Sequence, residues 1–187
     1  MIFKETELKG AYVIEPVASI DERGFFARTF CAEEFAKRGL AAGMAQCSTS
    51  FNTRRGTLRG LHYQDEPHAE DKLVRVTMGA VFDVIVDLRN GSPSYGRWFG
   101  QTLSAENRRM LYIPKGFAHG FQTLQDNSEV FYQISTFYEP ASVRGIRWND
   151  PDLAITWPDA DHAIISDRDR TLPLFTAATG ATAKVLA

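Results

Sequence analysis

The sequence predicts an all-β fold, either an antiparallel sandwich or a closed barrel. Short apolar or alternating runs recur at intervals of about ten residues, and almost no helical pattern lies between them. Clusters of turn-forming residues, such as Asn90–Pro93 and Asp126–Ser128, separate these runs. A chain of 187 residues has the length of one domain and can bury a sizeable core.

Seven runs are expected to form strands, because they are rich in β-branched and aromatic residues or alternate apolar with polar ones. In the run Val81–Asp87, the acids Asp83 and Asp87 share one face with Ile85, and the other face is apolar. Such a strand lines either a solvent-exposed surface or a wet barrel interior. The seven runs are Tyr12–Glu15, Leu73–Met78, Val81–Asp87, Trp98–Leu103, Arg109–Ile113, Gly120–Leu124 and Val130–Thr136.

Helical signals are few. The best is Ala32–Leu40, where acidic residues lie early and Gly39 lies near the end. A weaker one is Ser104–Arg108, where the serine is a possible cap.

The domain is expected to span residues 1–175, followed by a flexible, low-complexity tail at 176–187. After Tyr138 the chain is rich in Pro and Asp, which indicates an irregular segment wrapped over the body rather than a second domain.

Charge and composition exclude several classes of protein. Lys and Arg number 21 against 23 Asp and Glu, a net charge of −2, so non-specific binding to nucleic acid or to a membrane is not expected. No apolar run reaches the ~18 residues of a membrane span, and the start lacks a signal-peptide pattern, so the expected location is the cytoplasm. Cys31 and Cys47 form no CxxC pair and suit a reducing compartment.

The stretch Arg59–Gln64 is the first candidate for chemistry. His62 lies two positions from Gly60, so a residue without a side chain is expected to leave room beside the imidazole. A histidine in such a place can act as a general base near neutral pH, and the alternative is a structural histidine in a barrel wall. The late loop Ile165–Arg170 is either a solvated turn or the source of an Asp that folds back onto His62 as a His–Asp dyad.

Two further stretches carry candidate side chains. Tyr112–Gly120, which contains His119, is similar to the second half-motif of cupin barrels. In metal-binding cupins three histidines and a glutamate hold the metal, but Gln64 or Gly60 stands where a second His is needed, so a metal is not expected. His119 then braces the pocket floor by hydrogen bonds. Tyr132 is either a core tyrosine or a functional one.

Eight motifs follow one another in a fixed order: Asp21–Phe26 (DERGFF), Arg59–Gln64, Lys72–Val76, Phe82–Arg89, Ser104–Phe121, Glu129–Gln133, Asn149–Pro158 and Ser166–Asp169. Together they resemble the dTDP-4-dehydrorhamnose 3,5-epimerase family, from about residue 5 to about residue 175. The resemblance implies a cupin-like jelly-roll β-barrel with one or two short peripheral helices. It also implies a homodimer that needs no metal or other cofactor.

The resemblance implies a substrate in which a 4-keto-6-deoxyhexose is linked to a nucleoside diphosphate. Inversion beside a ketone needs proton carriers on both faces of the sugar ring and a positive group at the ketone oxygen. At the family positions His62 is the base, Asp169 orients it, Tyr132 donates a proton on the opposite face, and Lys72 lies beside the keto oxygen. The expected activity is metal-independent epimerisation at C3, C5 or both through an enolate.

The resemblance also implies contacts with the rest of the nucleotide sugar. Guanidinium groups suit the phosphate oxygens, aromatic side chains suit the nucleoside, and a histidine supports the pocket. The expected binding residues are Arg23, Phe26, Arg59, His119, Tyr138 and Arg168.

Four departures from the family pattern fall on the nucleotide side of the pocket. Ser19 stands where the family commonly has Phe, Arg28 and Val143 stand where it has Glu, and Gln46–Ser50 replaces QDNHS. The sequence therefore leaves the nucleoside open.

Three alternatives remain beside the double epimerase. They are a mono-epimerase acting on a different nucleoside-diphosphate keto-sugar, a metal-dependent cupin oxygenase or isomerase, and a non-catalytic sugar- or nucleotide-binding barrel. Strand-like residues at Met1–Glu7 are expected to pair across a two-fold dimer interface.

Overall fold

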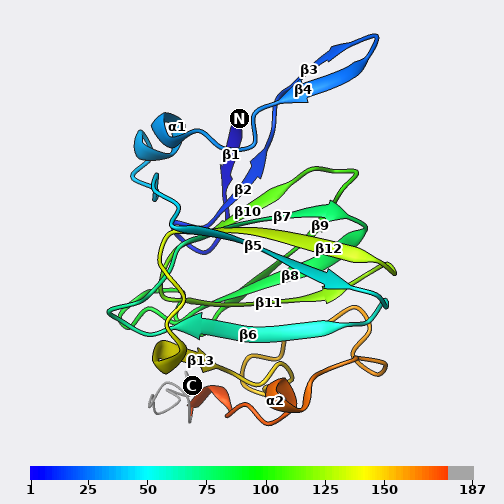
Figure 1. The fold of residues 1–187 in the computed structure, drawn as a ribbon. Coiled ribbons are helices and arrows are strands. Elements are labelled where there is room, and N and C mark those ends of the chain that lie inside the picture. Colours follow the sequence, from blue (N-terminus) through cyan, green and yellow to red (C-terminus); the bar gives the residue numbers. More distant parts are fainter. Residues whose placement is uncertain (177–187) are drawn as a thin grey trace.

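The computed structural model describes residues 1–176, which form two antiparallel sheets stacked face to face and a separate hairpin (Figure 1). Two short helices, α1 (Ala32–Ala36) and α2 (Asp167–Arg170), and a 3-10 turn at Pro140–Ser142 lie outside the sheets. The strands are β1 (Ile2–Glu5), β2 (Tyr12–Glu15), β3 (Ala18–Asp21), β4 (Gly24–Ala27), β5 (Gln46–Asn52), β6 (Leu58–Gln64), β7 (Lys72–Met78), β8 (Ala80–Asp87), β9 (Trp98–Ser104), β10 (Met110–Ile113), β11 (Phe117–Thr123), β12 (Ser128–Ile134) and β13 (Val143–Gly145).

The larger sheet has the strand order β1-β2-β10-β7-β12-β5, and the smaller one has the order β13-β6-β11-β8-β9. Many neighbours are far apart in the sequence, such as β2 and β10, or β6 and β13. The prediction of an all-β, cupin-like jelly roll with one or two short peripheral helices is confirmed. The seven predicted runs correspond to β2 and to β7 through β12, with ends that agree within three residues.

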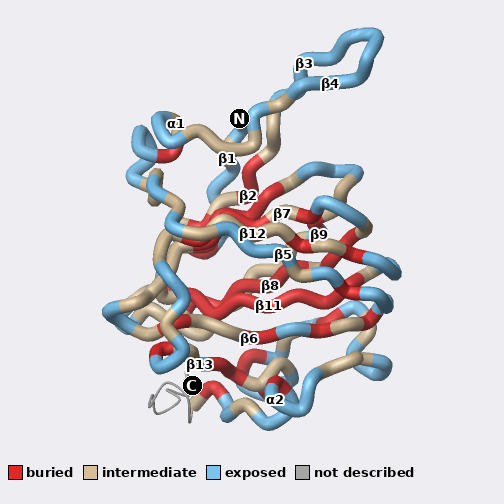
Figure 2. Tube along the Cα trace, in the orientation of Figure 1, coloured by how far each residue is buried: buried red, intermediate tan, exposed pale blue. Residues whose placement is uncertain are grey.

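The main core lies between the two sheets, where the buried strands appear in red in Figure 2. Val74 and Val130 point inward from the larger sheet and meet Ile85 and Phe121 from the smaller one, and none of the four is more than 1% exposed. Removal of these side chains from water is the main stabilising contribution of the sandwich.

The smaller sheet is covered on its outer face as well. The chain from residue 138 to residue 176 wraps under it (Figure 1), and Ile146 and Trp157 from this segment pack with Val84 and Val86 of β8. The alternative that β8 lines a solvent-exposed surface is therefore wrong, because its inner face carries Asp83 into the barrel. Of the predicted tail at 176–187, all but residue 176 lies outside the described residues.

The helix α1 covers the outer face of the larger sheet. Phe35 is fully buried there, with its ring centroid 5.8 Å from that of Tyr112 and 5.3 Å from that of Phe3. The helix is shorter than predicted: it ends at Ala36 instead of reaching Leu40, because Gly39 adopts a φ of +70° that terminates the helical path.

The second predicted helix, Ser104–Arg108, is wrong. The segment is the turn between β9 and β10, and Asn107 organises it: its side-chain oxygen accepts hydrogen bonds from the backbone N–H groups of Ser104 (3.1 Å) and Arg109 (2.9 Å). These local bonds compete with helical ones, and Arg108 at a φ of 54° closes the turn.

The hairpin formed by β3 and β4 projects from the body into solvent (Figure 1). Its apolar side chains remain uncovered in the single chain, with Ile20 80% and Phe26 79% exposed. Such exposure of large apolar side chains is unusual on the surface of a single chain.

Asp87 at the end of β8 provides a test of how the barrel rim is stabilised. Burial alone would raise the pKa of Asp87, but hydrogen bonds from Arg89, Ser92 and Ser94 outweigh it and lower the pKa to about 2. Because the pKa is lower in the folded state, the ionised Asp87 contributes to the free energy of unfolding above pH 3.8, and this contribution is lost as the pH falls toward 2. Asp87→Asn is expected to lower the free energy of unfolding at pH 7 by about 1–2 kcal/mol.

Urea denaturation at pH 7 and at pH 3 measures this effect. The difference between the wild type and Asp87→Asn should shrink at pH 3, while Asp161→Asn, at an exposed position, should match the wild type at both values. A difference that is the same at both pH values would contradict the assignment.

Candidate active site

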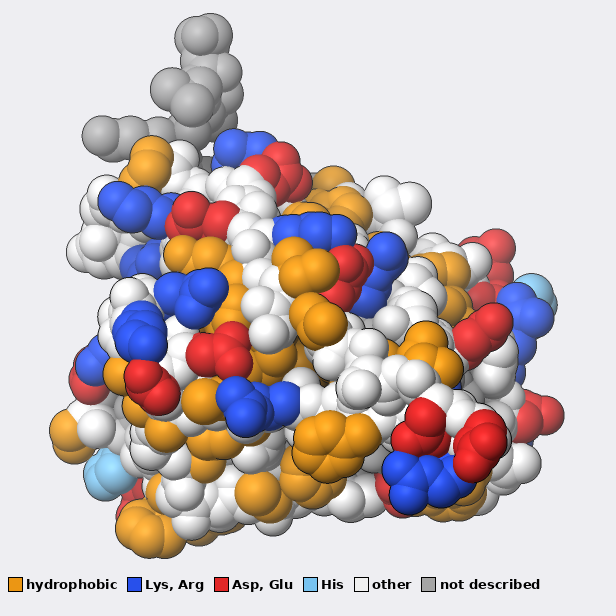
Figure 3. Space-filling model, turned by 90° about the horizontal axis from the view of Figure 1, so that it is seen from above, with side chains coloured by type: hydrophobic (Ala, Val, Ile, Leu, Met, Phe, Trp, Pro, Cys, Tyr) orange, Lys and Arg blue, Asp and Glu red, His pale blue; other side chains and the backbone are white. Residues whose placement is uncertain are grey.

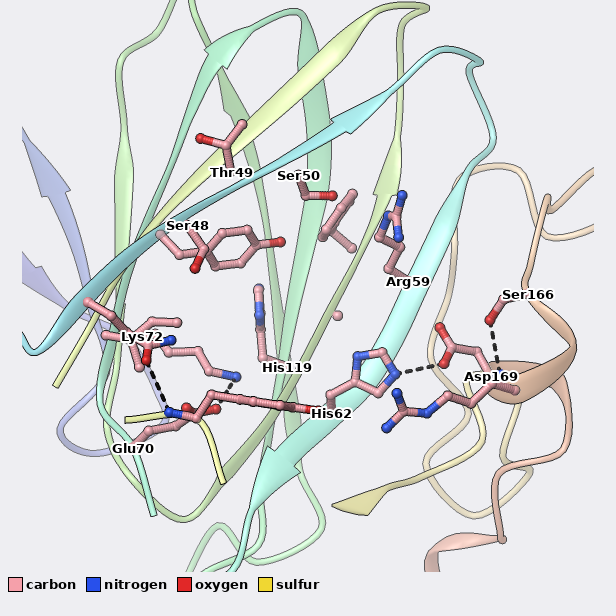
Figure 4. Close-up of a pocket in the computed structure, with 17 residues that line it drawn as sticks. Ser48, Thr49, Ser50, Arg59, His62, Glu70, Lys72, His119, Ser166 and Asp169 are labelled. Atoms are coloured by element: carbon pink, nitrogen blue, oxygen red, sulfur yellow. Dashed lines mark hydrogen bonds and ion pairs between the residues drawn. The ribbon is translucent and has the colours of Figure 1, made fainter. Parts of the chain in front are cut away.

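A cavity of about 740 Å³ opens between the two sheets (Figure 4). Strands β5, β7 and β12 of the larger sheet and β6 and β11 of the smaller one form its walls, and α2 borders one side. Eight of the ten predicted site residues line it. The polar lining side chains include Gln46, Ser48, Ser50, Arg59, His62, Glu70, Lys72, His119, Tyr132, Tyr138, Ser166, Arg168 and Asp169.

His62 on β6 is paired with Asp169 on α2. The imidazole Nε2 lies 2.7 Å from Asp169 Oδ1, and the other carboxylate oxygen accepts the backbone N–H of Gly60 at 3.1 Å. Ser166 caps the helix by accepting the N–H of Asp169. Because an ionised carboxylate only accepts, Nε2 carries the hydrogen and Nδ1 is the proton acceptor of the ring.

The environment of Asp169 keeps it ionised. Burial opposes this, since the residue is only 4% exposed, but the hydrogen bond and charge of His62 and the N–H of Gly60 outweigh burial and lower the pKa of Asp169. A carboxylate that stays charged at neutral pH stabilises the imidazolium that forms when His62 takes a proton. The predicted fold-back of an Asp onto His62 is thus present in the structure.

Two glycines bring the strands of the site together. A Cβ on Gly60, which has a φ of +126°, would lie 2.6 Å from the Cα of Gly120 and 2.9 Å from the carbonyl oxygen of His119. The expectation that Gly60 leaves room beside the imidazole is wrong, because the backbone of β11 fills that space. The close approach instead sets His62 opposite His119 on the neighbouring strand.

His119 is held from behind by a buried carboxylate. Its Nε2 lies 3.0 and 2.9 Å from the two oxygens of Asp83, and the residues are 5% and 0% exposed. The imidazole meets the Tyr132 ring edge to face, with centroids 6.0 Å apart. Burial, and then the charge of Asp83, raise the pKa of Tyr132, while Arg59 partly opposes them. The Tyr132 phenol therefore stays protonated and can act as a proton donor.

Lys72, the first residue of β7, extends into the cavity from the larger sheet. Its Nζ lies 2.9 Å from Glu70 Oε1, and the side chains are 10% and 11% exposed. The second carboxylate oxygen of Glu70 accepts a hydrogen bond from Gln64 Nε2 at 3.1 Å. The ammonium is thus ion-paired at the cavity wall.

Two guanidinium groups, of Arg59 and Arg168, also line the cavity. Arg59 Nε donates to the neutral side chain of Asn52 at 2.8 Å, and within residues 1–176 neither arginine forms an ion pair. They are available for an anionic ligand. Tyr138 lies at the same opening, and its backbone N–H donates to Gln46 Oε1 at 3.0 Å.

Two predicted binding residues do not reach this cavity. Arg23 and Phe26 lie on the β3–β4 hairpin, where Arg23 pairs with Asp21 at 2.6 Å. Ser19 is on the same hairpin, and Arg28 follows it and approaches Glu34 at 3.4 Å. Ser19 and Arg28, two of the four departures from the family pattern, therefore do not line the cavity of their own chain.

The other two departures lie at the cavity. Gln46, Ser48 and Ser50 line its wall on β5, and Val143 lies in a smaller adjoining cavity of about 150 Å³ that also touches His62 and Arg168.

The sequence interpretation did not select Glu70 or Gln64, and it noted Asp83 only as an acid on one face of a strand. Glu70 stands two positions before Lys72, but it precedes the strand, so no strand alternation places it. An acid within the apolar run of β8 was the one signal for Asp83, since a buried acid needs a partner. Residues 1–176 contain no group of three or more His, Cys, Asp or Glu arranged to hold a metal ion, and no helix among them is long and apolar enough to cross a membrane.

Comparison with known proteins finds relatives that cover most of the chain. A curated dTDP-4-dehydrorhamnose 3,5-epimerase from Methanothermobacter thermautotrophicus is 48% identical over 170 residues, which cover 90% of this chain and 91% of that protein. A Legionella pneumophila dTDP-6-deoxy-D-glucose-3,5-epimerase, solved in complex with dTDP-4-keto-L-rhamnose, is 41% identical, with a TM-score of 0.87 and 92% of each chain covered.

A third protein differs in its reaction. This 3′-monoepimerase from Streptomyces bikiniensis, solved with dTDP-quinovose, is 35% identical, with a TM-score of 0.86 over 94% of this chain and 88% of the other. Residues 5–177 match the family described as dTDP-4-dehydrorhamnose 3,5-epimerase. The chain therefore belongs to the dTDP-4-dehydrorhamnose 3,5-epimerase family and is an epimerase, an enzyme of the isomerase class.

Proposed function

We propose that this epimerase inverts C3 and C5 of a 4-keto-6-deoxyhexose linked to a nucleoside diphosphate, without a metal. The observation that carries the proposal is the arrangement of the cavity: His62 projects from the smaller sheet and Lys72 from the larger one (Figure 4). Tyr132, on β12 of the larger sheet, lines the same cavity. A hexose between the sheets then has a proton acceptor on one face and a proton donor on the other. The product is a deoxysugar precursor for polysaccharide synthesis.

Each inversion follows as a balanced pair of proton transfers. His62 Nδ1 takes the proton from the carbon beside the ketone, and the electron pair of the broken C–H bond moves to the ketone oxygen as an enolate. The ammonium of Lys72 stabilises that oxygen, and Asp169 stabilises the new imidazolium. When the enolate collapses, Tyr132 gives its phenolic proton to the carbon from the opposite face. Exchange with water restores the protonation states of His62 and Tyr132.

The diphosphate and nucleoside occupy the open side of the cavity. Arg59 and Arg168 bind the phosphate oxygens, because within residues 1–176 neither forms an ion pair, whereas Lys72 is paired with Glu70. Tyr138, at the opening, contacts the nucleoside. The hydroxyl side chains of Ser48 and Ser50 on β5 make this wall polar without bulk.

The hairpin completes the cavity of a second copy in a homodimer. Arg23 and Phe26 occupy family positions for substrate contact, yet they lie away from the cavity of their own chain. Figure 3 views the face on the hairpin side, where apolar side chains are exposed among charged ones. Strand β1 pairs with β2 of its own chain and is the edge of the larger sheet, so only its outer edge is open to a partner. Light scattering should give twice the chain mass of 20.9 kDa; a monomer would contradict this arrangement.

Incubation with dTDP-4-keto-6-deoxyglucose in heavy water tests the reaction. Deuterium at both C3 and C5 supports the double epimerase. Deuterium at C3 alone supports the second candidate, a mono-epimerase, which the similarity to the 3′-monoepimerase favours. No incorporation at either carbon would rule out this substrate.

Tyr132→Phe is expected to separate proton exchange from inversion. The variant keeps the ring that packs against His119 but loses the phenolic proton, so His62 can still remove and return a proton on one face. Inversion should fall by about 10²-fold, while deuterium exchange with retained configuration persists. NMR of the sugar ring measures both. Equal loss of exchange and inversion would show that Tyr132 is not a face-specific donor.

A further inference from the structure

Lys72 is distinguished from the other cations of the cavity by its partner. Arg59 and Arg168 have no carboxylate within residues 1–176 that pairs with them, whereas Lys72 Nζ lies 2.9 Å from Glu70 Oε1. A guanidinium without an ion-pair partner attracts a permanently charged anion such as a diphosphate. An ammonium that is already neutralised by a carboxylate attracts phosphate less, but it retains two N–H donors for a small oxygen.

A hydrogen bond from Gln64 holds the carboxylate of Glu70 in place. Its second oxygen accepts from Gln64 Nε2 at 3.1 Å, and Gln64 is 4% exposed. The amide of Gln64 also donates to the carbonyl of His68 at 2.9 Å and accepts the backbone N–H of Glu139 at 2.7 Å. A chain of contacts thus runs from the backbone through Gln64 and Glu70 to the ammonium of Lys72.

We propose that Glu70 is a positioning residue, which holds the ammonium of Lys72 where the ketone oxygen of the substrate becomes an enolate. The proposal rests on the function proposed above. A lysine side chain has four rotatable bonds, so an unanchored ammonium spreads over many positions. One carboxylate bound at both oxygens restricts the ammonium, and both Glu70 and Lys72 line the cavity, so the restricted ammonium stays at the cavity wall.

Glu70→Gln tests the proposal because an amide has a single oxygen. In the variant an NH2 group replaces one of the two carboxylate oxygens, so it faces either the ammonium of Lys72 or the amide N–H of Gln64, and that hydrogen bond is lost. We expect kcat to fall by about 10- to 100-fold with KM within about twofold of the wild type. Glu70→Asp, which keeps both oxygens, should recover part of kcat. The matched control is Asp65→Asn, a half-exposed carboxylate in the same connection that pairs with Arg144, and it should leave kcat unchanged.

A double-variant cycle shows whether Glu70 acts through Lys72. In a Lys72→Met background, Glu70→Gln should reduce kcat by no more than about twofold further, because the group that it positions is gone. A purely structural role of Glu70 would lower kcat in both backgrounds and would lower the melting temperature as well. If Glu70→Gln does not fold, Glu70→Ala takes its place in the same cycle.

Three results would overturn the proposal: an unchanged kcat in Glu70→Gln, a rise in KM alone, or a full further loss of kcat in the Lys72→Met background. The wild-type enzyme shows whether a negative result contradicts the role of Glu70 or the proposed function. Wild-type protein that incorporates no deuterium into the keto-sugar contradicts the function itself. Active wild type with an equally active Glu70→Gln contradicts only the role of Glu70.

Discussion

Replacement of His62 by Asn should reduce deuterium incorporation at C3 and C5 by about 10² to 10⁴-fold, the usual contribution of a general base. Asn removes the imidazole and its bond to Asp169, but Asp169 is also held by the backbone N–H of Gly60 and by Ser166, so the fold should be preserved. The Asn amide cannot accept a proton, and no other imidazole replaces His62, since the second one in the cavity, His119, is bound by Asp83.

The control for this variant is His162→Asn. His162 is exposed and bonded to Asp159 outside the cavity, so its replacement removes an imidazole without touching the site. Quench-and-NMR assays at several enzyme concentrations give the rates. A His62→Asn rate within tenfold of the wild type would mean that another group removes the proton.

Lys72→Met should have the second-largest effect. The thioether side chain fills a similar volume but leaves the enolate oxygen without a positive partner, which should reduce kcat by about 10² to 10³-fold. Both carbons share the one ketone, so exchange at C3 and C5 should fall in the same proportion. KM should change little, because Arg59 and Arg168, the proposed ligands of the diphosphate, are unchanged.

Steady-state kinetics with the same keto-sugar measure this variant beside Lys115→Met, an exposed lysine on the loop before β11. If Lys72→Met raised KM and left kcat intact, Lys72 would be a binding residue and the enolate would need another stabilising group. Loss of exchange at only one carbon would separate the two inversions.

The strands were predictable because alternation and turn chemistry are local signals that the barrel uses directly. Val81–Asp87 shows the limit of such local signals. Its alternation allowed the face with the acids to point either to solvent or into the barrel. The segment that contains Trp157 covers the other, apolar face, so the acids point into the barrel. The helical predictions depended on short-range detail: the first helix ends early, ahead of the left-handed Gly39, and at the second a side-chain-to-backbone bond of Asn107 forms a turn instead of a helix.

The site was predictable where family motifs carry it, as with His62 and Asp169, which lie 107 positions apart and meet at 2.7 Å. Its internal pairings were not. The partners of Lys72 and His119 are Glu70 and Asp83, and their contacts depend on how loops and neighbouring strands place side chains in three dimensions. The position of the hairpin was not predictable either, because the sequence of one chain does not show whether Arg23 lies at the cavity of its own chain or of a second copy.

The crossing of β6 and β11 has a consequence for engineering substrate scope. Any side chain at Gly60 or Gly120 would collide with the opposite backbone and drive apart the two strands that carry His62 and His119. Mutagenesis libraries should therefore leave this glycine pair invariant and diversify the polar wall of β5 instead, because its side chains line the cavity without standing at this crossing.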